Sequence, residues 1–334
     1  IYGATGEYAV ALGRDVISEG ESAIAIGKDV KANGLAATSL GSGNEVNSDY
    51  STALGNDNDI NTSHGAVAIG SNNELSNANN STALGSANIV NANAASAIGE
   101  SNTVSGIAAT AIGSNNNTEG DYAASIGFAN AAIGNNSLAI GNSNAASNEN
   151  AIAMGNESEA LGVTTTAMGT SWASSFLSVS MGRYSDTIVG SNRNTWVDTD
   201  PLLTLGNGSN YTNLKNAMTV YKNANTEISG YTRLGLASEG APIIKTKKIT
   251  STSHADHNGE QSISHGLSAS KILSVSVLIE WNTNQFAPPA YSQSANLLYN
   301  YYINDGNIVI RNDTPSGNCL ICNKPVKLFI TYEE

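Results

Sequence analysis

Three histidines and one aspartate lie within twelve residues in the last quarter of the chain. They are His254, Asp256, His257 and His265. Imidazole and carboxylate groups are common metal ligands, and a threefold axis between copies of the chain would bring three copies of one histidine together. The serine and asparagine residues around them are instead typical of a solvated loop. The loop is the favoured interpretation, and the sequence implies no cofactor.

The two cysteines of the chain are three residues apart, at Cys319 and Cys322. This spacing occurs in redox motifs, but no βαβ pattern surrounds it and no helix N-terminus is indicated that would lower a thiol pKa. Either a local disulfide or a pair of buried thiols is therefore favoured over redox activity.

An aromatic, proline-bearing segment follows an apolar run at residues 272–279. Its aromatic and proline residues are Trp281, Phe286, Pro288, Pro289 and Tyr291, and its amide residues are Asn282, Asn284 and Gln285. Aromatic faces and amides suit stacking on a sugar and hydrogen bonding to it. The alternative is that these side chains close one end of a domain or contact another subunit. The segment is the best candidate for a receptor-binding surface.

Catalytic patterns are weak throughout the chain. The acidic pairs Asp57/Asp59 and Glu157/Glu159 could hold Ca²⁺, but they lack the glycine- and aspartate-dense nonapeptide of calcium β-rolls, so solvated turns are expected. No nucleophile elbow is present, and the sequence indicates no carboxylate pair outside turns. We therefore expect no enzyme, with a polysaccharide-degrading fibre as the least favoured alternative.

Composition and charge narrow the class of protein further. The 334 residues include 33 glycines, with only 13% charged and 6% aromatic residues, which favours a repetitive architecture over an ordinary globular enzyme. The net charge of −13 repels nucleic-acid phosphates, so nucleic acid is excluded as a partner. Residues 1–182 carry three basic and sixteen acidic residues, whereas residues 183–334 carry twelve of each. Two regions of different character are joined.

The chain has no run of about 18 apolar residues, so no helical membrane span is expected. It begins at Ile1 without a charged and then apolar leader, so we expect it to be processed or part of a longer protein.

The first half of the chain is a repeat with a mean period of about fourteen residues. Each copy ends in a small or polar residue, Ala, a Leu, Ile or Met, and Gly. The closing glycines are Gly13, Gly27, Gly41, Gly55, Gly70, Gly85, Gly99, Gly113, Gly127, Gly141, Gly155, Gly169 and Gly182. Extra copies end at Gly134 and Gly162, seven residues after a closing glycine, which predicts two short strands per turn of a coil. His64, alone among the repeats, is expected at a surface or interface.

The strands of this repeat are apolar on both faces. In residues 22–27, a period of two places Ile24 and Ile26 on one face and Ala23 and Ala25 on the other. A coil two strands wide buries only one face in its interior. We expect the alanine face to be left open and to be covered by other copies of the chain.

Residues 23–27, 66–70 and 137–141 resemble the head repeats of YadA-type trimeric autotransporter adhesins, and the likeness extends over residues 9–182. The resemblance implies a left-handed parallel β-roll in which three chains pack on a threefold axis, outside the cell. The same repeat occurs in phage tail fibres. Residues 200–235 and 324–334 resemble the connectors and C-terminal fibre domains of proteins from Bacteroidota and their phages.

The remainder of the chain predicts a short connector and an antiparallel β-domain. Candidate strands of the latter are residues 243–251, 261–264, 271–281, 297–303, 307–311 and 326–332. Asn304–Asn307, with glycine at 306, is a strong hairpin signal, and the strand set favours a small sandwich.

Together these observations predict an all-β chain: a trimeric β-solenoid at 1–182, a connector at 183–240 and a C-terminal sandwich at 241–334. We expect a homotrimeric extracellular fibre that binds a cell-surface glycan or protein receptor through its last domain. Because an adhesin would continue into a heptad stalk and membrane strands, while this chain ends at Glu334, we favour a virion tail fibre. The alternative is a cell-anchored adhesin whose repeats themselves bind matrix or surfaces.

Overall fold

The computed structural model describes residues 3–230, 232–233, 243–291, 294–315 and 317–333. The chain divides into two compact units, Ile1–Glu227 and Ile228–Glu334. The described elements are β-strands apart from two short 3₁₀ turns, η2 (Ala269–Lys271) and η3 (Ala295–Leu297), which confirms the predicted all-β class. Among the described residues, no helix is long and apolar enough to cross a membrane.

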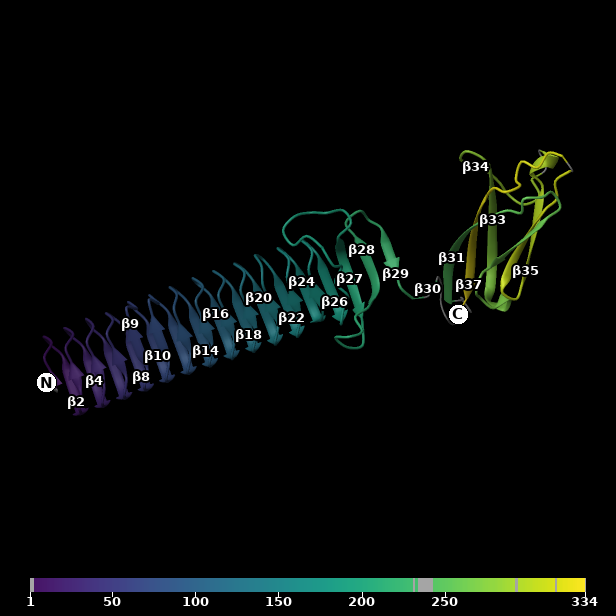
Figure 1. Cartoon of the computed structure of the whole chain (residues 1–334). Helices are drawn as coiled ribbons and strands as arrows, with labels where there is room; N and C mark the ends of the chain where they lie inside the picture. The colour runs from purple at the N-terminus through teal and green to yellow at the C-terminus, as the bar shows by residue number, and fades with distance from the viewer. Residues whose placement is uncertain (1–2, 231, 234–242, 292–293, 316, 334) are drawn as a thin grey trace. The chain divides into compact units, whose positions relative to one another are not determined.

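The first unit is a β-solenoid in which each coil contributes one long and one short strand (Figure 1). The long strands are β2 (Val10–Arg14), β4 (Ile24–Lys28), β6 (Thr38–Ser42), β8 (Thr52–Asn56), β10 (Val67–Ser71), β12 (Thr82–Ser86), β14 (Ser96–Glu100), β16 (Thr110–Ser114), β18 (Ala124–Phe128), β20 (Leu138–Asn142), β22 (Ile152–Asn156), β24 (Thr166–Thr170) and β26 (Val179–Arg183). The short strands are β1 (Gly3–Ala4), β3 (Ile17–Ser18), β5 (Lys31–Ala32), β7 (Glu45–Val46), β9 (Asp59–Asn61), β11 (Glu74–Ser76), β13 (Ile89–Val90), β15 (Thr103–Val104), β17 (Asn117–Thr118), β19 (Ala131–Ala132), β21 (Ala145–Ala146), β23 (Glu159–Ala160) and β25 (Trp172–Ala173). We call this stack, from β1 to β26, the shaft.

The closing glycines stack directly on one another along the shaft. Gly113 pairs in register with Gly99 on one side and Gly127 on the other. All thirteen closing glycines have φ between +100° and +139°, where side chains are strained. A Cβ on Gly113 would also lie 2.0 Å from the carbonyl oxygen of Gly127. The closing position therefore requires glycine both for its dihedral angle and for the approach of the next coil.

The alanines face the interior of the coil, so the expectation that the alanine face needs a partner is wrong. Ala25 and Ala111 are fully buried, whereas Ile24 and Ile112 are 37% and 38% exposed. The reason is steric: two strands joined by tight turns enclose a narrow interior, which accepts alanine and serine but not isoleucine at these positions. The open face of the long strands is therefore the one that carries Ile, Leu and Met.

A ladder of buried asparagines runs through the shaft, three residues after successive closing glycines. Its members are Asn44, Asn58, Asn73, Asn88, Asn102, Asn116, Asn130 and Asn144, all at most 1% exposed. The amide nitrogen of Asn102 donates to Asn88 Oδ1 at 3.0 Å and to the carbonyl of Gly113 at 2.9 Å. Its Oδ1 accepts from the main-chain and side-chain nitrogens of Asn116. Each interior asparagine thus joins its own coil to both neighbours.

Beyond the last regular coil, the sheet of long strands continues. β27 (Pro201–Asn207) pairs in parallel with β26, and Gly206 lies opposite Gly182. β28 (Asn216–Tyr221) and β29 (Thr226–Ile228) then extend the same sheet, and β28 runs antiparallel to β27. The segment expected to be a connector therefore completes the solenoid sheet, up to the end of the first unit.

The second unit is built from two antiparallel sheets that share one core. The larger has the order β30 (Thr232–Arg233), β31 (Ile243–Thr252), β37 (Pro325–Glu333), β33 (Ile272–Asn282), β34 (Gln285–Ala287). The smaller has the order β32 (Glu260–Ser264), β36 (Asn307–Asn312), β35 (Tyr299–Asn304). Buried side chains such as Ile279 and Leu328 from the larger sheet and Ile310 from the smaller one form a single cluster. The predicted antiparallel domain and its hairpin, in which Asn304 pairs with Asn307, are confirmed.

We expect replacement of a ladder asparagine to destabilise the shaft. The Asn102→Ala change removes the side-chain donor to the carbonyls of Ile98 and Gly113 and the acceptor of the Asn116 main-chain nitrogen. Leaving such groups unpaired costs about 1–3 kcal/mol each, so the urea midpoint of shaft unfolding should fall clearly. The exposed Asn142→Ala change is the control, because its amide bonds the exposed side chains of Asn156 and Ser143. Equal midpoints for the two variants would contradict a stabilising role for the ladder.

Candidate functional site

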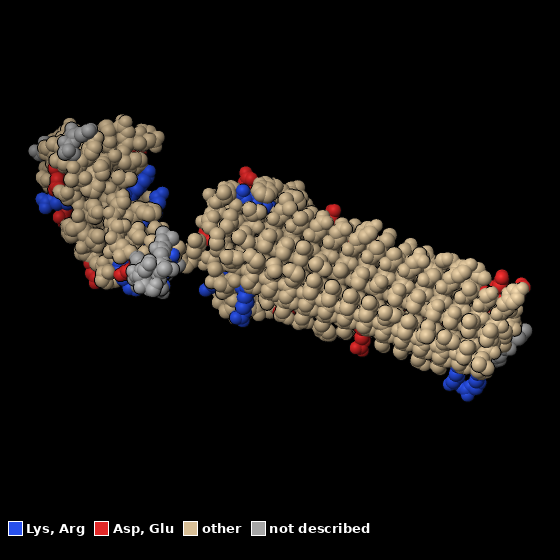
Figure 2. Space-filling view, turned by 180° about the vertical axis from the view of Figure 1, so that it is seen from behind, with Lys and Arg blue, Asp and Glu red and all other residues tan. Residues whose placement is uncertain are grey.

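A continuous row of Leu, Ile and Met side chains runs along the outward side of the long strands, and the first position of these strands carries either a further aliphatic residue or Thr, Ser or Ala. We call the outward Val, Ile, Leu and Met side chains the aliphatic face. It consists of Val10, Leu12, Ile24, Ile26, Leu40, Leu54, Val67, Ile69, Leu84, Ile98, Ile112, Ile126, Leu138, Ile140, Ile152, Met154, Met168, Val179 and Met181. Parallel pairing in register places Ile98, Ile112, Ile126 and Ile140 next to one another across four strands. Charged side chains are sparse along the shaft in the view of Figure 2. Exposed apolar surface of this extent marks an interaction site.

The hairpin of β33 and β34 carries the predicted receptor-binding residues apart from Tyr291, which follows β34. Its aromatic and amide side chains lie in different surroundings. Trp281 and Tyr291 are partly buried and pack against the domain core. Phe286 is half-buried, and Lys327 Nζ lies 3.9 Å from its ring centroid. The packing of the first two aromatic side chains fits the alternative role of closing one end of the domain.

The amide residues instead form the exposed tip of this hairpin, which we call the hairpin tip, residues 282–285. Asn282 Nδ2 donates to Gln285 Oε1 at 3.3 Å, and the main-chain nitrogen of Asn284 donates to Glu280 Oε1 at 3.1 Å. These bonds hold the tip in one arrangement with its amides toward solvent. Such a surface can exchange hydrogen bonds with a receptor at little cost in ordering.

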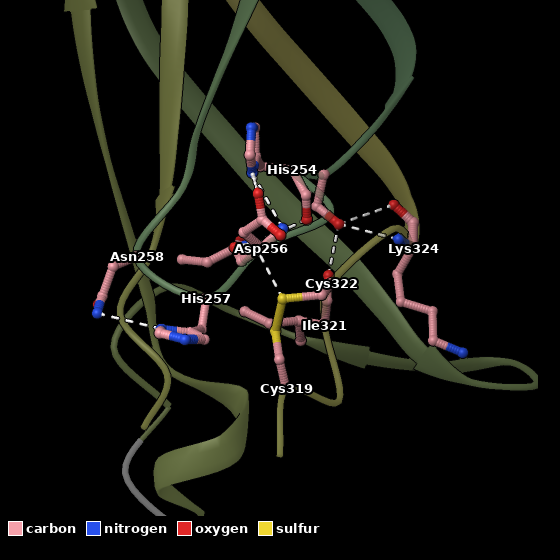
Figure 3. The surroundings of a disulfide bond; sticks show 10 residues. His254, Asp256, His257, Asn258, Cys319, Ile321, Cys322 and Lys324 are labelled. Atoms are coloured by element: carbon pink, nitrogen blue, oxygen red, sulfur yellow. Dashed lines mark hydrogen bonds and ion pairs between the residues drawn. A yellow bond between two sulfur atoms is a disulfide. The ribbon is translucent and has the colours of Figure 1, made fainter. Parts of the chain in front are cut away.

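The three histidines of the second unit lie in different surroundings. His265 is fully buried, its Nδ1 accepts from the nitrogen of Leu267, and its Nε2 lies 3.1 Å from the carbonyl of Asn304. His254 Nδ1 accepts from the nitrogen of Asp256, while His257 lies apart beside Asn258 (Figure 3). Among the described residues, no three His, Cys, Asp or Glu side chains are placed to hold a metal ion together.

Cys319 and Cys322 form a disulfide, which selects one of the two forms left open by the sequence (Figure 3). The loop that it closes contains Ile321, whose side chain is fully buried in the domain core. The hydroxyl of Ser253 donates to the carbonyl of Ile321, and Asn312 Nδ2 lies 3.4 Å from Cys322 Sγ. The disulfide therefore holds a core residue in place within a segment that has no strand of its own.

The two residues of the acidic pair Asp57/Asp59 lie on different elements. Asp59 lies on the short-strand side between Glu45 and Glu74, while Asp57 is on the preceding turn. Burial raises the pKa of the Asp59 carboxyl, and the charges of Glu45 and Glu74 raise it further. Lys31 offsets part of this charge through a 2.9 Å ion pair with Glu45.

The side chain of Lys222 is a buried cation near the end of the first unit. Lys222 Nζ lies 4.0 Å from Asp200 Oδ2 and 5.1 Å from the ring centroid of Trp196. Burial lowers the pKa of this amine, and the charge of Asp200 opposes the shift. Because the side chain is fully buried, we assign it to holding the segment before β27 against β28, not to catalysis.

The shaft matches the model of one protein family. This model, the YadA head domain repeat (2 copies), matches residues 4–29, 32–58, 105–130 and 132–158. All four segments lie within the solenoid, so YadA-like head repeats are present in the shaft, as the resemblance of the sequence predicted. No curated protein matches the chain.

Reduction of the disulfide should destabilise the second unit alone. The loop is short, so the loss is expected to be about 2 kcal/mol. Calorimetry of the full chain should show one transition shifted down by reductant and the shaft transition unchanged. The Cys319→Ser/Cys322→Ser variant should already unfold at the lower temperature and should not respond to reductant. A reductant effect on that variant would show that the shift does not come from this disulfide.

Proposed function

We propose that this chain, whose shaft contains YadA-like head repeats, is one subunit of a homotrimeric extracellular fibre. YadA-like repeats belong to trimeric, surface-exposed adhesins. The aliphatic face is the observation that carries the proposal, because it is long, apolar and open along the whole shaft. Three shafts packed through this face would shield one another from water.

The size of this effect is sufficient for stable assembly. Covering an isoleucine that is about 40% exposed, such as Ile98 or Ile112, contributes roughly 1 kcal/mol. Thirteen coils then supply on the order of 10 kcal/mol per chain before the entropic cost of association. The acidic side chains of the short-strand side, such as Glu45 and Glu74, would remain in water and keep the fibre soluble.

In this proposal the second unit is the receptor-binding domain. The hairpin tip is its binding surface, and a cell-surface glycan is its ligand, because amide donors and acceptors match sugar hydroxyls. Three copies on one fibre would add avidity to a weak individual site. The fibre acts by binding, with the shaft as a rigid spacer and without catalysis.

A virion tail fibre is the setting that we favour from the sequence, and a bacterial cell-surface adhesin is the alternative. Antibodies against the second unit would distinguish them by labelling either virions or cells.

Charges on the aliphatic face should dissociate the trimer. The Ile112→Glu/Ile126→Glu variant would place six carboxylates within the proposed interface, where desolvation penalises them. Light scattering should then give the mass of one chain, against three times that mass for the wild type. Ile107→Glu is the control, because Ile107 is 48% exposed but lies on a turn outside the aliphatic face. A monomeric wild type would contradict the proposal.

Removal of the amides from the hairpin tip should reduce attachment. We expect Asn282→Ala/Gln285→Ala to lower binding of the full chain to target cells or immobilised glycans about tenfold, while the light-scattering mass stays unchanged. Asn300→Ala removes an exposed amide from β35 and should leave binding intact. Binding that depends on Asn300 but not on the tip would place the receptor site on the smaller sheet instead.

A further inference from the structure

Two coils of the shaft contain one residue more than their neighbours. In the regular coils, four residues separate the buried residue of the short strand from the buried residue before the long strand, as between Val46 and Ser51. Five residues separate Ile60 from Ala66, and five separate Leu75 from Ser81. The strands on both sides stay in register, so the extra residue is confined to the turn.

The two extra residues support each other. Thr62 and Asn77 both adopt the left-handed conformation, with φ of 52° and 55°. Thr62 Oγ1 lies 3.1 Å from Asn77 Oδ1, to which it donates, and it accepts from the Asn77 main-chain nitrogen at 3.1 Å. The two longer turns therefore form an ordered step beside the shorter turn of the preceding coil.

A hollow of about 330 Å³ lies at this step. Its walls include Asn47, Asp49, Asn61, Thr62, His64 and Asn79. Ligand pockets in proteins have volumes of roughly 300–1,000 Å³, so this hollow is at the small end and suits a single compact ligand. It lies on the turns between short and long strands, apart from the aliphatic face.

Two residues of the wall, Asp49 and Asn79, use one polar side-chain atom in a hydrogen bond to the protein and leave the other without one. Asp49 Oδ1 accepts from the main-chain nitrogen of Leu35 at 2.8 Å, and Asn79 Oδ1 accepts from that of His64 at 2.8 Å. Within the described structure, Asp49 Oδ2 and Asn79 Nδ2 make no hydrogen bond. The hollow thus presents a fixed acceptor and a fixed donor whose positions are set by the neighbouring coils.

An aromatic pair adjoins these groups. The rings of Tyr50 and His64 meet edge to face, with centroids 5.1 Å apart. Tyr50 is 56% exposed and has φ of 54°, the left-handed conformation that the same turn position adopts at Tyr8 and Tyr122. The corresponding turn positions of the adjacent coils hold Ala36 and Gly65. Tyr50 therefore places an exposed ring at a turn position where neither neighbouring coil has one.

We propose that this hollow is a second binding site, on the shaft, for one residue of a neutral saccharide. A carboxylate acceptor and an amide donor match neighbouring hydroxyls of a sugar, and His64, whose ring is held edge to face by Tyr50, offers its ring to the C–H face of the sugar. No Lys or Arg lines the hollow, and the charge of Asp49 disfavours an acidic sugar. The site is independent of the hairpin tip and would repeat three times around the proposed trimer.

Saturation-transfer NMR of the full chain tests the site with the methyl glycosides of galactose, glucose, mannose and N-acetylglucosamine. At least one should receive saturation. Asp49→Asn keeps the acceptor for Leu35 and replaces the open oxygen, and His64→Ala removes the ring. Each change should weaken binding about tenfold, as expected for the loss of one hydrogen bond to a charged group or one stacking contact.

Asp121→Asn is the matched control. Asp121 accepts from the Ile107 nitrogen at 2.8 Å and precedes Tyr122, as Asp49 precedes Tyr50, but its turn has the regular length. Asp121→Asn should bind the sugar like the wild type, and the transfer that depends on Asp49 and His64 should persist in the hairpin-tip variant. Joint deletion of Thr62 and Asn77, which restores the regular turns, should abolish binding.

Several results would overturn the proposal: no transfer to any of the four glycosides, transfer unchanged in both Asp49→Asn and His64→Ala, or transfer lost in the hairpin-tip variant. Tighter binding of the methyl glycoside of N-acetylneuraminic acid than of any neutral sugar would also overturn it. If the deletion variant fails to fold, the two point variants decide, because neither changes the length of the turn.

Discussion

The close approach of successive coils is the constraint from which the rest of the shaft follows. At the closing position, the carbonyl of one glycine occupies the space that a Cβ of the preceding glycine would need, as between Gly113 and Gly127. Two strands joined at this distance leave room for only alanine or serine at the interior positions of the long strands, while larger side chains of the short strands, such as Ile60 and Leu75, fill the rest of the interior. The larger apolar side chains of the long strands, such as Ile112, therefore point outward, and the exposed apolar surface of the shaft is a direct result of its narrow interior.

The same narrowness explains the asparagines inside the coil. The turn after each long strand leaves main-chain groups that the parallel ladders do not pair, and these groups are buried. Asn102 bonds the carbonyls of Ile98 and Gly113, and its own oxygen is taken by Asn116. In the coils at one end of the shaft, valine replaces asparagine at the equivalent position, at Val16 and Val30. Toward the other end, serine replaces it, at Ser158 and Ser171. Ser158 still donates to a closing-glycine carbonyl, so the link between coils is kept with a shorter side chain.

The repeat, its two strands per coil and the strands of the second unit could be predicted from sequence, because periodicity and turn residues encode them. Which face of the long strands points into the coil could not be predicted. Ile24 and Ala25 alternate, so both faces are apolar, and the sequence does not indicate which of them is enclosed. The buried asparagine ladder was not predicted, because asparagine after glycine normally indicates an exposed turn. Its signal was the constant spacing of three residues from Gly99 to Asn102 and from Gly113 to Asn116. The inward packing of Trp281 depends on the pairing of β33 with β37, which is distant in sequence.

The direction of the hydrogen bonds between coils has a mechanical consequence. They run from coil to coil, along the stack, and each coil is joined to the next by only one covalent connection. A force that pulls the two ends of the shaft apart would therefore act on the hydrogen bonds between successive coils in series, and it would open them one coil at a time. Each released coil lengthens the chain by about fourteen extended residues, roughly 45–50 Å, and lets the tension drop. A fibre of this kind would yield gradually under flow or drag, with many small ruptures in place of one sudden detachment.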